Sequence, residues 1–258
     1  MDFKTIVYEV KESIATITLN RPSAYNAITA EMNMEITKAL KMGNRDESVR
    51  CIVITGNGKA FCSGQDLAGV DEETNHATFL RERYHPMLKA MKQTHKPIVA
   101  AINGTAAGAG MSLALAADYR LMQPNAKFVS AFLNVGLIPD SGFLYMLPRL
   151  VGYANALEIS TIDKPITGEE ASGIGLVTKV INPTEWEEEV WAFAKQLAEL
   201  PTTSFSLIKR YMIDGMHSEL DVFLEQEAHA QRIAGLTKDH QEGLRAFVER
   251  RKPNFSGK

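Results

Sequence analysis

The beginning of the chain alternates apolar and polar residues in the manner of paired strands. Residues 5–10 and 14–19 alternate on either side of Lys11-Glu12 and predict a β-hairpin. The apolar spacing then takes the period of a helix from about Ala30 to Met42, and Thr29 is placed to cap its first turn. The first 42 residues therefore predict two strands followed by one helix.

Two later runs are apolar throughout, which is typical of strands that are covered on both faces. Cys51 to Thr55 is one of them and Ile98 to Ile102 is the other, and each is followed by a turn containing Asn and Gly. A helical stretch at 77–94 lies between them and contains His85-Pro86. Because proline lacks an N–H and restricts the residue before it, we expect a kink or break there.

Helical patterns dominate after about Gly168. Thr167 and Glu170 have the spacing of a capping box. Four helical stretches follow, at 185–200, 204–213, 219–234 and 239–250. The sequence predicts an α/β core over residues 1–200 and a helical region over 201–258 that packs on this core or on a neighbouring subunit.

Composition narrows the choice of partners. Lys and Arg total 28 against 31 Asp and Glu, a net charge of -3 that gives no reason to expect nucleic acid or an anionic membrane as a partner. No apolar run approaches the roughly 18 residues of a spanning helix, and we expect a cytoplasmic protein. Cys51 and Cys62 are too far apart for a Cys-x-x-Cys pair, and the histidines lack the spacing of metal ligands. We therefore expect no metal, no disulfide and no redox cofactor.

Asp140 is the candidate acid and base. It stands in the run Gly136-Leu-Ile-Pro-Asp140-Ser-Gly142, among apolar and glycine neighbours. A pocket formed by Phe132, Leu137 and Phe143 would raise the pKa of this carboxyl above its ordinary value of about 3.9. The alternative is a turn residue, because Pro-Asp-Ser-Gly is also good turn chemistry.

Two glycine-containing segments offer backbone N–H groups. Gly64 lets the chain turn sharply and present the N–H of Gln65, while Gly108 to Gly110 opens a helix of small residues. Two such donors that converge on a thioester oxygen would stabilise an enolate. The alternatives are a surface turn and close packing of a helix on a strand.

Four segments in this order and spacing resemble the crotonase, or enoyl-CoA hydratase/isomerase, superfamily. They are Asn20-Arg-Pro-x-x-x-Asn26-Ala27, Ala60-Phe-Cys-Ser-Gly-Gln-Asp66, Asn103 to Gly110 and Gly136 to Gly142, and the match continues to Arg251-Lys-Pro-Asn-Phe255. The resemblance implies a spiral of β-β-α units with a C-terminal helical trimerisation region, in a homotrimer or hexamer. It also implies an acyl-CoA substrate, of which coenzyme A is a part rather than a separate cofactor.

By position in this family, Gln65 and Ala109 would donate the two N–H groups of an oxyanion hole, and Asp140 would move the proton. The residues expected along the substrate are Ser23, Tyr25, Ser63, Gly64, Asp66, Leu67, Gly108, Phe132 and Pro139.

The hydratases of the family use two glutamates, and Ser112 and Phe132 stand at their places here. Adding water calls for one group that deprotonates it and another that handles the carbon-bound proton. Asp140 instead matches a third position that carries Asp or Glu in double-bond isomerases, and its surroundings resemble the 1,2-epoxyphenylacetyl-CoA isomerase branch. The resemblance therefore favours an acyl-CoA isomerase. Phe143 replaces a glycine that is common in that branch, so the identity of the acyl group stays open.

Three alternatives stay open. One is an enoyl-CoA hydratase of fatty-acid β-oxidation, which the overall resemblance favours. Another is an acyl-CoA hydrolase or dehalogenase that uses Asp140 and His85, since 4-chlorobenzoyl-CoA dehalogenases have a histidine base at the place of His85 but tryptophan at that of Phe132. The last is a non-catalytic acyl-CoA-binding protein.

Overall fold

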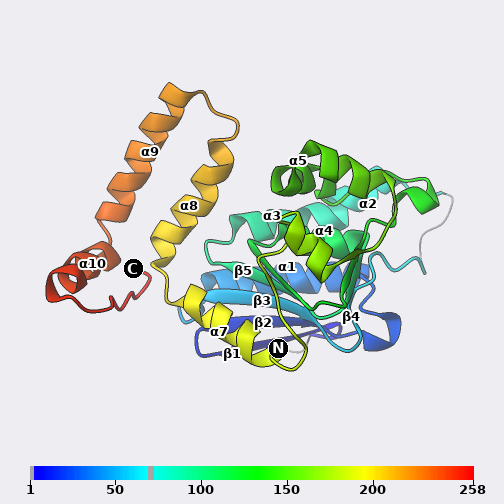
Figure 1. Cartoon of the computed structure of the whole chain (residues 1–258), viewed down its shortest axis with the longest axis horizontal. Helices are drawn as coiled ribbons and strands as arrows, with labels where there is room; N and C mark the ends of the chain where they lie inside the picture. The colour runs from blue at the N-terminus through cyan, green and yellow to red at the C-terminus, as the bar shows by residue number, and fades with distance from the viewer. Residues whose placement is uncertain (1–2, 69–72) are drawn as a thin grey trace.

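A computed structural model describes residues 3–68 and 73–258, and its strands form two sheets (Figure 1). The larger sheet has the order β1 (Ile6–Lys11), β2 (Ile14–Leu19), β3 (Cys51–Gly56), β5 (Ile98–Ile102), β7 (Tyr119–Met122) and β10 (Lys179–Val180). The smaller sheet has the order β4 (Ala60–Cys62), β6 (Thr105–Ala107), β8 (Lys127–Val129) and β9 (Ile166–Thr167). The pairs β1–β2 and β8–β9 are antiparallel, and the other pairs are parallel.

The chain visits the two sheets in turn. It passes from β3 to β4 and through helices to β5, then through β6 and α4 (Ala109–Ala116) to β7, and finally through β8 to α5 (Phe143–Thr161). Each repeat of this path therefore adds one strand to each sheet and one helical segment beside the sheets. The predicted spiral of β-β-α units is confirmed.

The larger sheet is covered on both faces, which explains its continuous apolar runs. In β3, Ile52 and Ile54 join the main core, whereas Cys51 and Val53 join a second cluster with α7 (Trp186–Ala198). Successive side chains of a strand point to opposite faces, so a strand between two apolar layers contains no polar alternation. The β1–β2 hairpin is also confirmed, with Ile6 opposite Leu19.

The capping residues identified in the sequence lie at the starts of two helices, as predicted. The Thr29 side chain accepts a hydrogen bond from Met32 N at 3.1 Å, and the helix that it caps, α1, spans Ala30–Arg45. Thr167 and Glu170 form both bonds of a capping box at the start of α6 (Gly168–Gly173). The predicted end of the first helix at Met42 was three residues early.

The expected break at His85-Pro86 is replaced by a change of helical winding. A π-helical turn, η2 (Leu80–Tyr84), lies between α2 (His76–Phe79) and α3 (His85–Gln93). The His85 N–H bonds to Leu80 O, five residues back, and His85 itself keeps helical dihedrals. Pro86 falls in the first turn of α3, where its missing N–H needs no partner.

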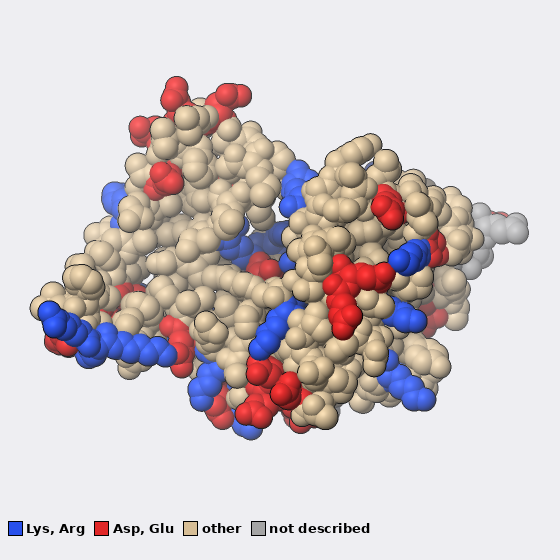
Figure 2. All heavy atoms as spheres, viewed as in Figure 1, with Lys and Arg blue, Asp and Glu red and all other residues tan. Residues whose placement is uncertain are grey.

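The last three helices form an arm that extends away from the sheets (Figure 1). They are α8 (Thr202–Asp214), α9 (Leu220–Gly235) and α10 (Lys238–Glu249), and with α7 they match the predicted stretches to within two residues at each end. Figure 2 shows a hollow with Lys and Arg side chains between this arm and the core, and Lys92, Lys209 and Arg210 line it. Among the described residues, no helix is both long enough and apolar enough to cross a membrane.

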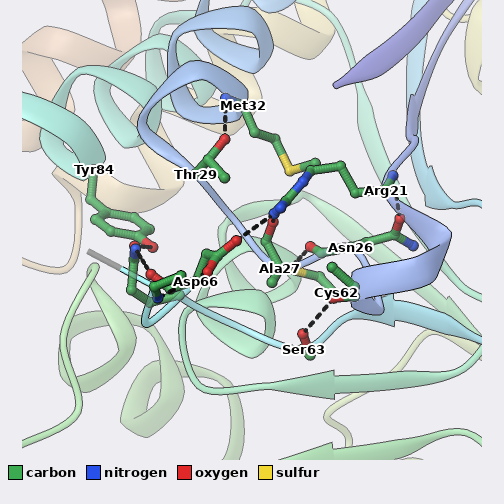
Figure 3. A network of polar contacts seen from close by, with 12 residues as sticks. Arg21, Asn26, Ala27, Thr29, Met32, Cys62, Ser63, Asp66 and Tyr84 are labelled. Carbon is green, nitrogen blue, oxygen red and sulfur yellow. Dashed lines mark hydrogen bonds and ion pairs between the residues drawn. The ribbon is translucent and has the colours of Figure 1, made fainter. Parts of the chain in front are cut away.

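Asn26 ties the loop before α1 to the turn that enters the smaller sheet (Figure 3). Its buried amide accepts from Arg21 N at 2.9 Å and donates to Asn57 O at 3.0 Å and Ala60 O at 2.9 Å. Asn26 also has φ of 57°, a left-handed conformation that asparagine tolerates better than most residues. This residue therefore fixes how the segments on either side of β3 meet.

We expect Asn26→Ala to lower the free energy of unfolding by about 3 kcal/mol, because it leaves buried backbone groups without partners. Urea unfolding measures the change. The exposed Asn20–Asn57 side-chain bond provides the control, and Asn20→Ala should cost about 0.5 kcal/mol or less. Equal losses in the two variants would contradict the role given to Asn26.

Candidate active site

A cavity of about 230 Å³ lies where four segments meet. The loop after β4 contributes Ser63, Gly64, Gln65 and Leu67, and the start of α4 contributes Gly108 and Ala109. The segment before α5 contributes Ala131, Phe132, Val135, Leu137 and Asp140. The helical wall, which is formed by α2 and η2, contributes His76, Phe79, Leu80 and Tyr84.

Glycines allow the first two segments to touch. Gly64 has φ of 102°, and a Cβ atom at this position would lie 2.9 Å from Ala107 O and 3.5 Å from Ala109 N. A Cβ atom at Gly110 would lie only 2.2 Å from Cys62 O. Any larger residue would push the loop after β4 away from the start of α4.

The backbone N–H groups of Gln65 and Ala109 have no acceptor among the described residues. Ala109 is the first residue of α4, so its N–H has no partner within the helix. Ile28 bonds on either side of Gln65, donating to Gly64 O at 2.7 Å and accepting from Asp66 N at 3.0 Å. The Gln65 N–H consequently points away from Ile28, and both N–H groups are available to a ligand.

Asp140 lies at the end of the segment that leads into α5. Its backbone carbonyl accepts from Phe143 N at 2.9 Å and from the Ser112 hydroxyl at 3.1 Å. Burial raises the pKa of the Asp140 carboxyl above its ordinary value, and Ser141, followed by the nearby His76 and His85, offsets part of this rise. The predicted direction of the pKa shift is therefore confirmed.

The segment that carries Asp140 also contributes aromatic side chains next to the cavity. Phe132 packs edge to face on Phe143 with the ring centroids 5.7 Å apart. Phe132 and Leu137 line the cavity as expected, whereas Phe143 is fully buried behind Phe132 and does not line it. Ser112 is also fully buried, and its hydroxyl is used on backbone carbonyls.

Eight of the sequence-predicted site residues line the cavity together. They are Gln65, Ala109, Asp140, Ser63, Gly64, Leu67, Gly108 and Phe132. Ser23, Tyr25, Asp66 and Pro139 are not among the lining residues.

Asp66 and Pro139 are direct chain neighbours of the lining residues Gln65 and Asp140, whereas Ser23 and Tyr25 come from a separate turn. Asp66 is paired with Arg21 at 2.8 Å (Figure 3), and hydrogen bonds from Ala68 N and from Arg21 lower its pKa. Tyr25 is exposed and its carbonyl accepts from Ser63 N at 3.0 Å, which brings the Ser23 to Tyr25 turn next to the loop after β4.

His85 is exposed and does not line the cavity, whereas His76 and Tyr84 do. Sequence reasoning missed both of these residues. The π-helical turn decides which side chains of this segment face the cavity, and only the proline at 86 signalled an irregularity there.

The described residues contain no group of three or more His, Cys, Asp or Glu that could hold a metal ion. Cys51 and Cys62 are both buried as free thiols. Burial raises the pKa of Cys62 to about 12, so this thiol stays protonated, and it lies 3.2 Å from Asn26 O.

Known proteins share both this sequence and this fold. The family model described as enoyl-CoA hydratase/isomerase matches residues 9–258. A protein of Rhodobacter capsulatus named "Probable enoyl-CoA hydratase" is 42% identical over 100% of both chains. The 1,2-epoxyphenylacetyl-CoA isomerase of Escherichia coli is 37% identical over 98% of both.

A crystal structure of an enoyl-CoA hydratase from Bacillus anthracis superimposes with a TM-score of 0.92 at 30% identity. It covers 99% of this chain and 100% of its own. Sequence and fold therefore agree, and the chain belongs to the enoyl-CoA hydratase/isomerase family.

Proposed function

We propose that this enzyme isomerises an enoyl-CoA thioester, shifting a double bond or rearranging an unsaturated ring. The observation that carries the proposal is the cavity itself, in which two unpartnered backbone N–H groups accompany a carboxyl whose pKa is raised. Gln65 and Ala109 are the proposed donors to the thioester oxygen. Asp140 is the proposed proton carrier.

The proposed reaction is a proton transfer within the substrate. Ionised Asp140 takes a proton from the carbon next to the double-bond system, and the electron pair delocalises onto the thioester oxygen. The two N–H groups stabilise this enolate, and losing one such donor typically costs about 3 kcal/mol of transition-state stabilisation. Asp140 then returns the proton to the other carbon, which leaves the atoms and charges of the thioester balanced.

The cavity supports isomerisation over hydration because Asp140 is the only carboxylate among its described lining residues. Buried Ser112 and the Phe132 ring occupy the two positions at which the resemblance implies glutamates in hydratases. Hydration is the second candidate, since the relative at 42% identity is named as a hydratase.

Three substrates offered in parallel would separate these reactions. We expect the purified protein to convert a 3-enoyl-CoA, or a ring-epoxide phenylacetyl-CoA, faster than it adds water to a 2-enoyl-CoA. Absorbance of the conjugated thioester and mass spectrometry of the products measure the three rates. Faster hydration than double-bond migration would reverse the assignment.

We expect Asp140→Asn to lower kcat by about a hundredfold or more while the protein still binds acyl-CoA, because the amide cannot carry the proton. In the wild type, kcat/KM should rise with pH through the raised pKa of Asp140, since the base must be ionised. Unchanged turnover in the variant would exclude the proton shuttle. If the wild type binds acyl-CoA but turns over none of the three substrates, the alternative of a non-catalytic binding protein is favoured instead.

The same variant should be more stable than the wild type near pH 7. The folded state holds the Asp140 proton more tightly than the unfolded chain, so the stability contributed by this site is full below the unfolded pKa and is lost as pH rises through the raised one. Asparagine removes this loss. Thermal unfolding at pH 7 and pH 4 measures the difference, and the control Glu9→Gln, at an exposed site on β1, should show none.

A hydrolytic role for His85 receives little support, because this side chain is exposed and does not line the cavity. His76 is the imidazole on the cavity wall. A hydrolase or dehalogenase that worked through Asp140 would therefore be sensitive to His76→Ala and insensitive to His85→Ala.

We also propose that residues 201–258 form a separate helical region through which the chain assembles as a trimer. Its arm exposes large apolar side chains, including Phe247 at 84% and Leu236 at 73%. An apolar surface of this kind on a soluble protein marks an interaction site.

We expect the double variant Leu236→Asp with Phe247→Asp to lower the assembly mass measured by light scattering on a sizing column. Val10→Asp, at an exposed apolar site on β1, serves as the control and should leave the mass unchanged. A monomeric wild type would contradict the proposal.

A further inference from the structure

Tyr84 connects the helical wall of the cavity to the loop that carries Gln65 (Figure 3). Its side chain is only 2% exposed, and its hydroxyl donates to Gln65 Oε1 at 2.5 Å. The other end of the same amide, Gln65 Nε2, donates to Asp66 O at 2.7 Å. Both polar atoms of the Gln65 side chain are therefore held, one by the helical wall and one by its own loop.

The π-helical turn accounts for the position of Tyr84. Tyr84 is the last residue of this turn, and the extra residue in the turn changes the face on which its side chain lies relative to an unbroken α-helix. Phe79, one turn earlier, packs beside it with the ring centroids 6.1 Å apart. Tyr84 is thus packed within the helical wall beside Phe79.

The Tyr84 hydroxyl is suited to donate at every pH at which the enzyme works. Burial raises the pKa of this phenol far above its ordinary value, and the negative charge of Asp140 adds to the rise. The phenol consequently stays protonated when Asp140 ionises. Its single proton then lies on the bond to Gln65.

Gln65 also carries one of the two unpartnered backbone N–H groups of the cavity. A donor in an oxyanion hole must point to the place where the negative charge develops, and a small rotation of its peptide unit weakens it. Ile28 restrains this peptide from one side through the bonds to Gly64 and Asp66. Tyr84 restrains the side chain from the other.

We propose that Tyr84 is a positioning residue for catalysis, which holds the Gln65 N–H in its orientation toward the thioester oxygen through the bond to Gln65 Oε1. This proposal rests on the proposed function, because it assigns Tyr84 a part in stabilising the same enolate. Tyr84 acts through Gln65 and does not itself transfer a proton.

Two substitutions remove this bond from opposite ends. Tyr84→Phe removes the donor, and Gln65→Met removes the acceptor while it keeps the backbone N–H. We expect each to lower kcat by about tenfold, the effect of losing roughly one hydrogen bond, with little change in KM. Because both variants break the same bond, the double variant should be no slower than the slower single one.

Matched measurements separate positioning from a structural role. Tyr8→Phe removes a hydroxyl from β1, outside the cavity lining, and should leave kcat unchanged. Thermal unfolding reports whether each variant folds, and Gln65→Met tests the same bond if Tyr84→Phe does not. Additive losses of kcat in the double variant, or unchanged kcat in a folded single variant, would overturn the proposal.

A conjugated ligand provides a readout that does not need turnover. Polarisation of the thioester carbonyl shifts the absorption of bound 2,4-hexadienoyl-CoA to longer wavelength. We expect this shift in the wild type and a smaller shift in both variants at saturating ligand. If the wild type and the variants show the same shift, the role of Tyr84 is rejected and the oxyanion hole is retained. If the wild type shows no shift, both the oxyanion hole and the role of Tyr84 are rejected.

Discussion

The close backbone contact between the loop after β4 and the start of α4 is the constraint on which the rest of the site depends. Gly64 and Gly110 permit it, because a Cβ atom at either position would meet backbone atoms of the opposite segment. Asn26 holds the other side of the same loop through buried hydrogen bonds. The result is a frame that brings two residues whose peptide N–H groups have no acceptor among the described residues to the lining of one cavity.

Asp140 is the part of this frame that costs stability. Its carboxylate is partly buried beside aromatic rings, and its raised pKa means that ionisation at neutral pH opposes folding. The backbone around it compensates, since Ser112 and the turn into α5 both bond to its carbonyl.

The core and the arm differ in how much of their apolar surface is buried within one chain. The core buries its apolar residues on both faces of the larger sheet, in two clusters that share the strands. The arm leaves Leu236, Phe247 and Val248 exposed, so its helices gain little from burial within one chain. The family shares this fold over nearly its full length, which makes the arm part of the common architecture rather than an addition to it.

The sequence by itself determined the elements whose signals are local: the hairpin, the buried apolar strands, the Thr29 cap, the Thr167 capping box and the terminal helices. It also singled out Asp140 and the glycine segments. Strands β4, β6, β7, β8, β9 and β10 were not predicted, since two to four residues are too few to show a period and pair only when the spiral brings them together. The tertiary structure alone decided that Tyr84 and His76 face the cavity while His85 does not, because the winding of a helix, and not the spacing along the chain, sets the direction of each side chain.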